Sequence, residues 1–300
     1  MSYLKSNFNL CVFEVPQNSL NASEIHDLLT QKAFVELLAS EEFGDGWCSM
    51  EDMFNSNFGL AEVNFSEYIA AGYRYDQKLI PKALIRKLYK GKLKARSKEE
   101  KLSKVDRQIL KEECKAELVI KTLAKPNSVH WIWDIKSNLI YLDTKSSKTV
   151  DNFIMLFTKT FGLNLTSKNY GLVEDQLSRF LDNIWTNIET MDGVWIDTNV
   201  VFDANKTKFN FSGSDLESYL KEIESIKKDK PVEKLGICIA IKDADYSIGF
   251  TNKNFIVTVK DSAKMKFESV DAAVIINSDR MKLITNKILN LVKNYYKGGI

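Results

Sequence analysis

The sequence predicts an α+β fold in which a basic helical hairpin projects from a body of strands and helices. Short runs that alternate apolar and polar residues predict strand hairpins, and longer runs with apolar residues three or four positions apart predict helices. The two kinds of run do not alternate in a regular βαβ order, which favours α+β over a doubly wound fold. The 300 residues are 44% hydrophobic with only four prolines, so the chain can bury substantial cores without long proline-rich linkers.

The N-terminal region, residues 1–80, is expected to combine strands with one helix. A strand over residues 3–15 ends at Pro16, and a helix then runs from Asn21 or Ser23 to about residue 39. The glycines of residues 43–47 suggest a loop. Residues 60–80 are interpreted as two strands around Ala71-Gly72, the second over residues 73–80.

The next region, residues 81–125, is expected to form a basic helical tip. Pro81 suits the first turn of a helix over residues 82–95, because the N–H that proline lacks would have no partner there. Ser103 and Asp106 resemble a capping box that begins a second helix, which extends to about residue 124. Two charged helices joined in this way predict a protruding helical hairpin.

The rest of the chain divides into a central hairpin and helix, residues 126–165, and a C-terminal α+β region, residues 166–300. The C-terminal pattern includes a short buried strand at 272–276, followed by a helix that begins at Ser278 or Asp279. The other expected elements are hairpins at 129–143 and 194–211, helices at 147–161, 171–188 and 214–226, and a meander of strands at 232–242, 246–251 and 255–260.

Positive charge is concentrated in one segment. Residues 78–98 contain nine basic residues and no acidic one, and residues 78–125 carry a net charge of +10 in a chain whose total is +2. Such a concentration favours a polyanion partner, since lysine and arginine gain free energy by displacing the counterions of phosphates. A solvated helix face without a partner is the alternative. The candidate phosphate contacts here are Lys78, Lys82, Arg86, Lys87, Lys90, Lys94, Arg96, Lys121 and Lys125.

Smaller basic clusters lie in the C-terminal region. Lys206 and Lys208 flank a predicted hairpin, and Lys227, Lys228, Lys230 and Lys234 follow a predicted helix. No motif of a sequence-reading nucleic-acid domain occurs, so contacts are expected mainly with backbone phosphates. The large aromatic residues have the spacing of core residues rather than of base-stacking platforms.

The sequence contains only weak signals for catalysis. Asp134 and Asp143, each two residues before a lysine, are the best candidates for a Mg²⁺-dependent nuclease, although such triplets arise by chance in a highly charged chain. His26 and His130 fit packing or surface positions better than general bases. No P-loop occurs and the four cysteines are scattered. We therefore expect no enzyme activity, no cofactor and no metal.

The order and spacing of several motifs resemble the RdgC family of recombination-associated proteins. These motifs are Gly46-Trp47, residues 78–81, the helix of residues 101–118, residues 131–134 with 138–143, residues 232–235, and Asp271-Ala272. The resemblance implies a central region, a helical tip and a C-terminal base, assembled into a homodimeric ring. It also implies encirclement of double-stranded DNA and control of the RecA recombinase.

The resemblance bears on the expected roles of Lys208, Lys234 and Leu123. Lys208 and Lys234 fall where the family has lysines that face DNA. Leu123 replaces a family aromatic near the end of the second tip helix, so a role that needs this ring is not expected, whereas Lys121 keeps the positive charge. The family label of exonuclease has no support in these residues.

We therefore expect a non-enzymatic, sequence-independent clamp on double-stranded DNA, with single-stranded DNA as a second ligand and RecA as a further partner. No signal-peptide pattern or membrane-length apolar run occurs, so a cytoplasmic, nucleoid-associated location is expected. Two alternatives stay open: a nuclease that uses Asp134 and Asp143, and a protein–protein adaptor whose basic arm binds an acidic partner.

Overall fold

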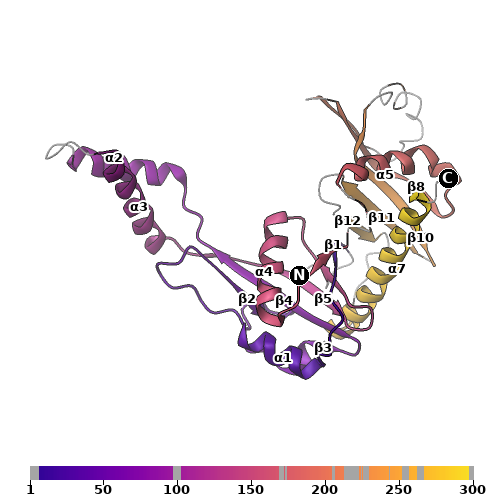
Figure 1. The fold of residues 1–300 in the computed structure, drawn as a ribbon, viewed down its shortest axis with the longest axis horizontal. Helices are drawn as coiled ribbons and strands as arrows, with labels where there is room; N and C mark the ends of the chain where they lie inside the picture. The colour runs from indigo at the N-terminus through magenta and orange to yellow at the C-terminus, as the bar shows by residue number, and fades with distance from the viewer. Residues whose placement is uncertain are drawn as a thin grey trace.

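The computed structural model forms an open arc. One limb is the pair of helices α2 (Lys82–Arg96) and α3 (Lys104–Lys121), and the other is the C-terminal half of the chain (Figure 1). The structure describes residues 7–96, 103–168, 172, 174–204, 207–212, 223, 225, 230–242, 244–251, 257–261 and 267–296.

The strands form one continuous antiparallel system in the order β2-β4-β5-β6-β1-β12-β11-β10-β8-β9, with β3 beside β4 and β7 beside β1. The strands are β1 (Phe8–Glu14), β2 (Phe43–Cys48), β3 (Asn64–Phe65), β4 (Tyr68–Gln77), β5 (Lys125–Asp134), β6 (Leu139–Leu142), β7 (Thr166–Ser167), β8 (Val194–Ala204), β9 (Thr207–Ser212), β10 (Val232–Ile241), β11 (Ala244–Thr251) and β12 (Val257–Asp261). The other helices are α1 (Ala22–Gln31), α4 (Ser147–Phe161), α5 (Glu174–Asn187) and α7 (Val270–Tyr296), with 3₁₀ turns at Leu60–Glu62 and Ile188–Thr190.

Strand β1 joins the two halves of this system. Its first residues pair with β12, with Phe8 opposite Val259, and its later residues pair with β6, with Phe13 opposite Ile140. The N-terminal strands and the C-terminal strands are therefore hydrogen-bonded through a single strand.

The central strands are buried on both faces. Trp131 and Trp133 of β5 point into an aromatic core with Phe153 and Phe157 of α4. Ile132, between the two tryptophans, points the opposite way into the core formed with α5 and α7. Because successive side chains of a strand point to opposite faces, this one segment contributes to both cores.

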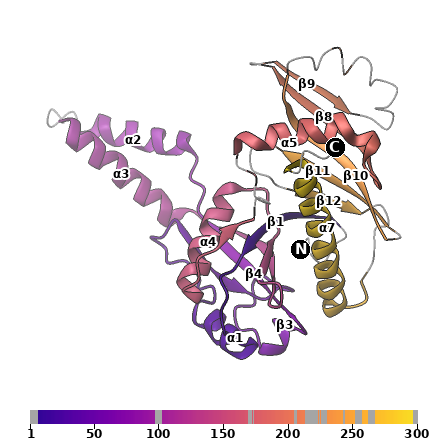
Figure 2. The same ribbon diagram turned by 45° about the vertical axis from the view of Figure 1, so that its right-hand side comes forward.

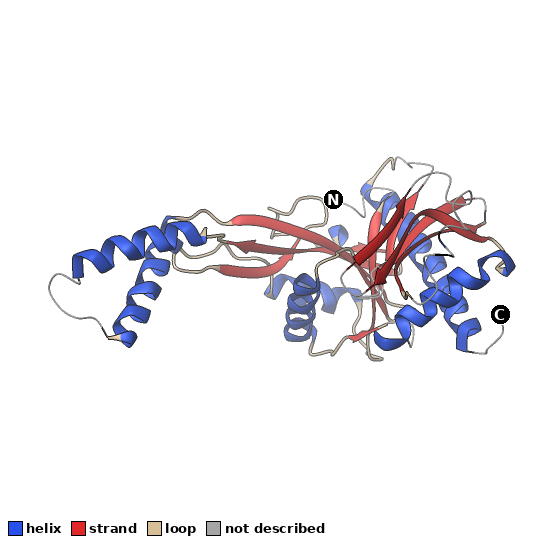
Figure 3. Cartoon of the chain, turned by 90° about the horizontal axis from the view of Figure 1, so that it is seen from above, coloured by secondary structure: helices blue, strands red, loops and turns tan. Residues whose placement is uncertain are grey.

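The arm made of α2 and α3 is an insertion between β4 and β5, whose ends pair at Gln77 and Lys125. Figure 3 shows it extending beyond the ends of these strands. The capping box forms as predicted, since Ser103 accepts from the Asp106 N–H and the Asp106 side chain accepts from the Ser103 N–H. Both tip helices are confirmed, and α3 ends at Lys121. No residue of α2 is buried, so the arm has little core of its own.

Two predictions for the N-terminal region are wrong. Helix α1 ends at Gln31 rather than near residue 39, and residues 43–47 form strand β2 rather than a loop. The chain leaves the helix because Phe34 N–H donates to the Trp47 carbonyl and Trp47 N–H donates to the Lys32 carbonyl. Gly46 permits this approach, because a Cβ there would lie 2.4 Å from Phe34 Cα.

Two further elements also differ from the sequence prediction. Residues 68–77 form one strand rather than two, and Gly72 at its centre accommodates Cys48, whose Sγ would lie 2.5 Å from a Cβ at that position. Residues 272–276 belong to the 27-residue helix α7 and not to a strand. The predicted helix over 214–226 lies outside the described residues, apart from 223 and 225.

The remaining predicted elements are confirmed with small shifts of their ends. Helix α4 has the predicted bounds, and the hairpins β5–β6 and β8–β9 and the meander β10–β11–β12 are present. Regions 1–80 and 126–165 share one sheet, since β4 pairs with β5 along ten residues.

Candidate nucleic-acid interface

The arm presents most of its cations to solvent. Helix α2 has no acidic residue, and its predicted contacts Lys82, Arg86, Lys87, Lys90, Lys94 and Arg96 are all exposed.

Ion pairs between the helices neutralise part of the charge. Lys92 Nζ lies 2.7 Å from the Glu117 carboxylate, and an Arg96 Nη lies 2.9 Å from that of Glu113. Glu117 also accepts from Lys121 at 2.6 Å. Hydrogen bonds from Lys121 and then Lys92 lower the pKa of Glu117 to about 2. The Glu117 carboxylate therefore stays ionised down to strongly acidic pH, and its contact with Lys92 helps to hold the two helices together.

The predicted contacts thus fall into two groups. Arg96 and Lys121 are engaged with carboxylates of α3. Within the described part of the chain, Lys82, Arg86, Lys87 and Lys90 have no acidic partner, and neither has Lys125, exposed at the start of β5. This second group is available to an external anion.

Lys78 has a structural position instead of a surface one. Its side chain is buried, and its Nζ donates to the Leu38 carbonyl at 3.2 Å and to the Ala39 carbonyl at 2.6 Å. It fastens the 38–39 turn to the end of β4, and its ammonium group does not face outward. We correct the candidate set by removing Lys78.

Three further cations on α3 belong to the arm surface. Lys104, Arg107 and Lys111 are exposed and have no acidic partner among the described residues. Their spacing of three and four residues places them on one face of the helix. This periodicity was visible in the sequence, but the acids interleaved on the same helix obscured it. Those acids turn toward α2 or lie on other faces.

The C-terminal candidates lie on the other limb of the arc. Lys234 of β10 is exposed, and β10 lies far from the arm (Figure 2). Lys206 lies outside the described residues, as do Lys227 and Lys228, and for Lys208 only the backbone, in β9, is described. Lys230 Nζ lies 4.0 Å from the centre of the Phe209 ring. The structure therefore does not bring the two predicted basic regions together within one chain.

The proposed nuclease carboxylates are also apart. Asp134 ends β5 and pairs with Leu139, whereas Asp143 follows β6 and bonds to the His130 carbonyl at the other end of the hairpin. Four residues of strand separate these positions, about 13 Å at ~3.3 Å per residue, whereas Mg²⁺ ligands lie ~2 Å from the ion. No group of three potential metal-ligating residues occurs in the described ranges.

Each of these two carboxylates has a structural partner. Asp134 is fully buried and accepts from Ser137 N–H at 2.9 Å and from Lys282 Nζ at 3.0 Å. Burial raises the pKa of Asp134, but the bonds from Ser137 and Lys282 outweigh burial and lower it overall. Burial raises the pKa of Asp143 despite two hydrogen bonds from Asn9.

The two histidines have surroundings typical of packing residues. His130 is buried, and burial lowers its pKa to about 3, so it is neutral at physiological pH. His26 Nε2 lies 3.1 Å from the Phe58 carbonyl at the edge of α1.

The large aromatic residues are mostly in the core, as predicted. Trp131 and Trp133 are fully buried and Trp185 nearly so, but Trp195 is 40% exposed on β8. Tyr170 lies outside the described residues. Among the described helices, none has the length and apolar character needed to cross a membrane.

Comparison with known proteins places these features in a family context. Residues 8–239 match a family model described as "Putative exonuclease, RdgC". Recombination-associated protein RdgC of Actinobacillus pleuropneumoniae serotype 5b (strain L20) is 25% identical over 297 residues, covering 90% of this chain and 91% of that protein. The protein of the same name from serotype 3 (strain JL03) gives the same values. That of Serratia proteamaculans (strain 568) is 26% identical over 157 residues, 51% of each chain.

Proposed function

The chain belongs to the RdgC family, and on this premise we propose that it is a sequence-independent DNA-binding protein that closes around double-stranded DNA as a homodimer. The single observation that carries the proposal is the arm. The net charge of residues 78–125 is +10, and cations of both helices are exposed with no acidic partner among the described residues.

The distribution of cations supports contact with backbone phosphate rather than with bases of a duplex. Lys82, Arg86, Lys87 and Lys90 follow one another along α2 and are joined by the α3 face of Lys104, Arg107 and Lys111. Long flexible cations spread over a convex helical surface match the regularly spaced charges of a DNA strand. The chain has no sequence motif of a groove-reading domain that would present these side chains to base edges, so little sequence preference is expected.

The open arc supports the homodimeric form of the proposal. Two arcs related by a twofold axis enclose a space that one arc leaves open (Figure 1). In such an assembly the arm and Lys234 line the same enclosed space although they lie on separate limbs of one chain. The recombination role, including control of RecA, rests on the family alone.

The proposal is non-enzymatic, and the positions of Asp134 and Asp143 support this. The two carboxylates lie at opposite ends of a hairpin, and each is held by a structural hydrogen bond. A nuclease of this chain would need other residues.

The test is fluorescence anisotropy of a labelled duplex over a range of salt concentrations. We expect log affinity to fall linearly with log salt, with a slope near −0.9 per phosphate contacted. The triple variant Lys82→Gln/Arg86→Gln/Lys90→Gln is expected to reduce the magnitude of the slope by up to about 2.7. Lys78→Met is the matched control from the same charge run, and because its ammonium is buried, we expect its slope to match the wild type.

Three results would contradict parts of the proposal. Equal slopes for the triple variant and the wild type would exclude the arm as the interface. Shortened DNA after incubation with Mg²⁺ would show a nuclease, and absence of binding at any salt concentration would favour the adaptor. For the clamp itself, protein loaded on closed circular DNA should resist a high-salt challenge better than protein on linear DNA of equal length.

A further inference from the structure

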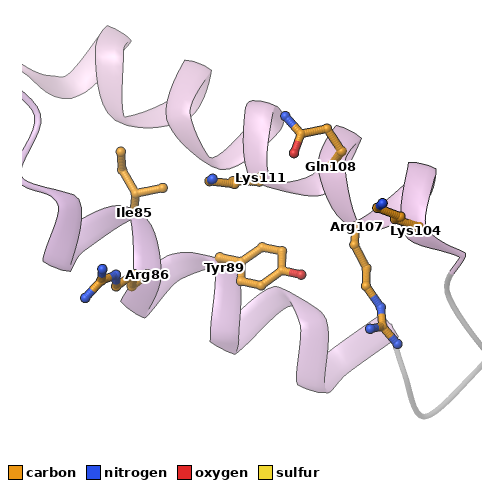
Figure 4. A pocket seen from close by; sticks show the side chains of 7 residues that line it. All are labelled: Ile85, Arg86, Tyr89, Lys104, Arg107, Gln108 and Lys111. Atoms are coloured by element: carbon orange, nitrogen blue, oxygen red, sulfur yellow. The ribbon is translucent and has the colours of Figure 1, made fainter.

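The arm contains a pocket between its two helices. It has a volume of about 410 Å³, within the range of ~300–1,000 Å³ typical of small-molecule sites. Tyr89 and Ile85 contribute from α2, and Gln108 and Lys111 contribute from α3. Figure 4 shows the Tyr89 ring lying in the gap between the helices, with its hydroxyl directed toward the Arg107 side.

The pocket surface is mostly apolar, and cationic side chains surround it. Tyr89 and Ile85 are half-buried, so their apolar faces are partly open to the pocket. Arg86, Lys104, Arg107 and Lys111 also line it, and among the residues that the structure describes no acidic side chain does. None of these four cations has an acidic partner within the described residues.

This combination selects a ligand that has both a flat ring and a phosphate. Inorganic phosphate would make no contact with the Tyr89 ring, and a neutral apolar ligand would gain nothing from the four exposed cations. A nucleotide satisfies both, because its base stacks on an aromatic side chain while its phosphate meets lysine and arginine. In a duplex, the bases are paired and stacked inside the helix, so only an unpaired base reaches such a surface.

We propose that this pocket binds one unpaired nucleotide of a nucleic-acid strand, with the base against Tyr89 and its phosphates held by Arg107 and Lys111. The inference rests on the proposed DNA-binding function of the arm and extends it. The exposed cations of α2 bind the backbone phosphates of single-stranded and duplex DNA alike. The pocket adds affinity for single-stranded segments only. The arm thereby distinguishes unpaired DNA from duplex.

The test compares Tyr89→Leu with Tyr89→Phe on three labelled 15-nucleotide probes: oligo-dT, an abasic strand of equal charge, and a blunt duplex. Leucine keeps an apolar side chain but removes the ring, so we expect oligo-dT affinity to fall about fivefold or more. Tyr89→Phe keeps the ring and should retain most of the affinity. Neither variant should change binding of the abasic strand or the duplex by more than about twofold.

A charge variant outside the pocket separates the inference from the proposed function. Lys87→Gln/Lys90→Gln should weaken binding of all three probes alike, because neither lysine lines the pocket. If it does so but Tyr89→Leu binds oligo-dT as tightly as the wild type, the pocket inference fails and the DNA-binding arm stands. If the wild-type protein binds none of the probes, both fail. Equal loss on oligo-dT and duplex for Tyr89→Leu also overturns the inference.

Discussion

Glu117 of α3 bonds to two lysines at once, to Lys92 across the arm at 2.7 Å and to Lys121 one turn further along its own helix at 2.6 Å. One carboxylate thus withdraws two cations from the exterior of the arm. Through Lys92 it also connects the two helices that line the Tyr89 pocket.

Removing this carboxylate should strengthen DNA binding. In Glu117→Gln, Lys92 and Lys121 lose their partner and become available to phosphates, so we expect duplex affinity at 50 mM salt to rise about two- to tenfold. Glu112→Gln is the matched control, because it removes the same charge from α3 and the partner of Glu112 among the described residues is the neutral Gln108. Anisotropy titrations of both variants provide the measurement, and an equal gain would show that net charge matters and pairing does not.

The contact between Lys282 and Asp134 should contribute a pH-dependent part of the stability. Lys282→Met leaves the buried Asp134 carboxylate with Ser137 alone, and because Lys282 is partly exposed to water we expect a loss of about 1–2 kcal/mol near pH 7. The pKa of Asp134 is lowered in the folded protein, so this stabilisation is complete above its unfolded pKa of about 4 and is lost as pH falls below that value.

Thermal denaturation of the Lys282→Met variant and the wild type between pH 3 and pH 7 tests this. The difference in Tm should be largest at neutral pH and shrink in acid. Lys287→Met, which removes a partly exposed lysine of the same helix whose partner is the Asp192 carbonyl and not a carboxylate, is the control and should change Tm little. A difference that grows as pH falls would contradict the assignment.

Two glycines should respond to alanine in opposite directions. At Gly46 a Cβ would lie 2.4 Å from Phe34 Cα and 2.6 Å from Phe34 N, so the backbone must move and we expect a loss of about 1–3 kcal/mol. At Gly91, within α2, a Cβ would meet nothing within 4 Å, and alanine should stabilise the helix by about 0.5–1 kcal/mol. Chemical denaturation of the two variants measures both changes in the free energy of unfolding. A neutral Gly46→Ala would show that β2 and residues 33–34 can separate.

The negative charge of Asp143 should not be needed for the stability of the fold. Both bonds from Asn9, at 2.8 and 3.0 Å, go to the same oxygen, Oδ1, so an asparagine can accept them through its amide oxygen. Burial raises the pKa of Asp143, hence the ionised form opposes folding above that pKa and the penalty disappears as pH falls. Asp143→Asn should therefore keep or raise Tm at pH 7, with the difference narrowing in acid. A catalytic Asp143 would instead show a loss of Mg²⁺-dependent DNA cleavage in this variant.

The parts of the fold that sequence reasoning predicted are those with local determinants. The arm helices follow from Pro81, the Ser103–Asp106 box and their charge pattern, and α4 follows from its apolar spacing. The errors arose where a distant segment decides the local structure. In the sequence, Gly46 suggests a loop and Gly72 a turn. In the folded chain, each glycine instead makes room for a neighbouring segment that is distant in the sequence.

The candidate site shows the same difference between local and distant determinants. The charge run located the arm, yet it could not separate Lys78, whose ammonium caps two carbonyls, from Lys82, which is exposed only four residues later. Nor could it show which lysines the α3 carboxylates engage, because that depends on how the two helices pack. The Tyr89 pocket arises from the same packing and has no linear signature.

The double pairing of β1 has a consequence for biosynthesis. Phe8 leaves the ribosome well before its partner Val259, which lies far downstream in the sequence. The growing chain can pair β1 with β6 and assemble the aromatic core first, while the Phe8–Leu10 edge stays open. An open edge strand can join to another chain. Co-translational folding of this protein therefore passes through a stage at which crowded polysomes favour mispairing, and arrival of β12 ends it.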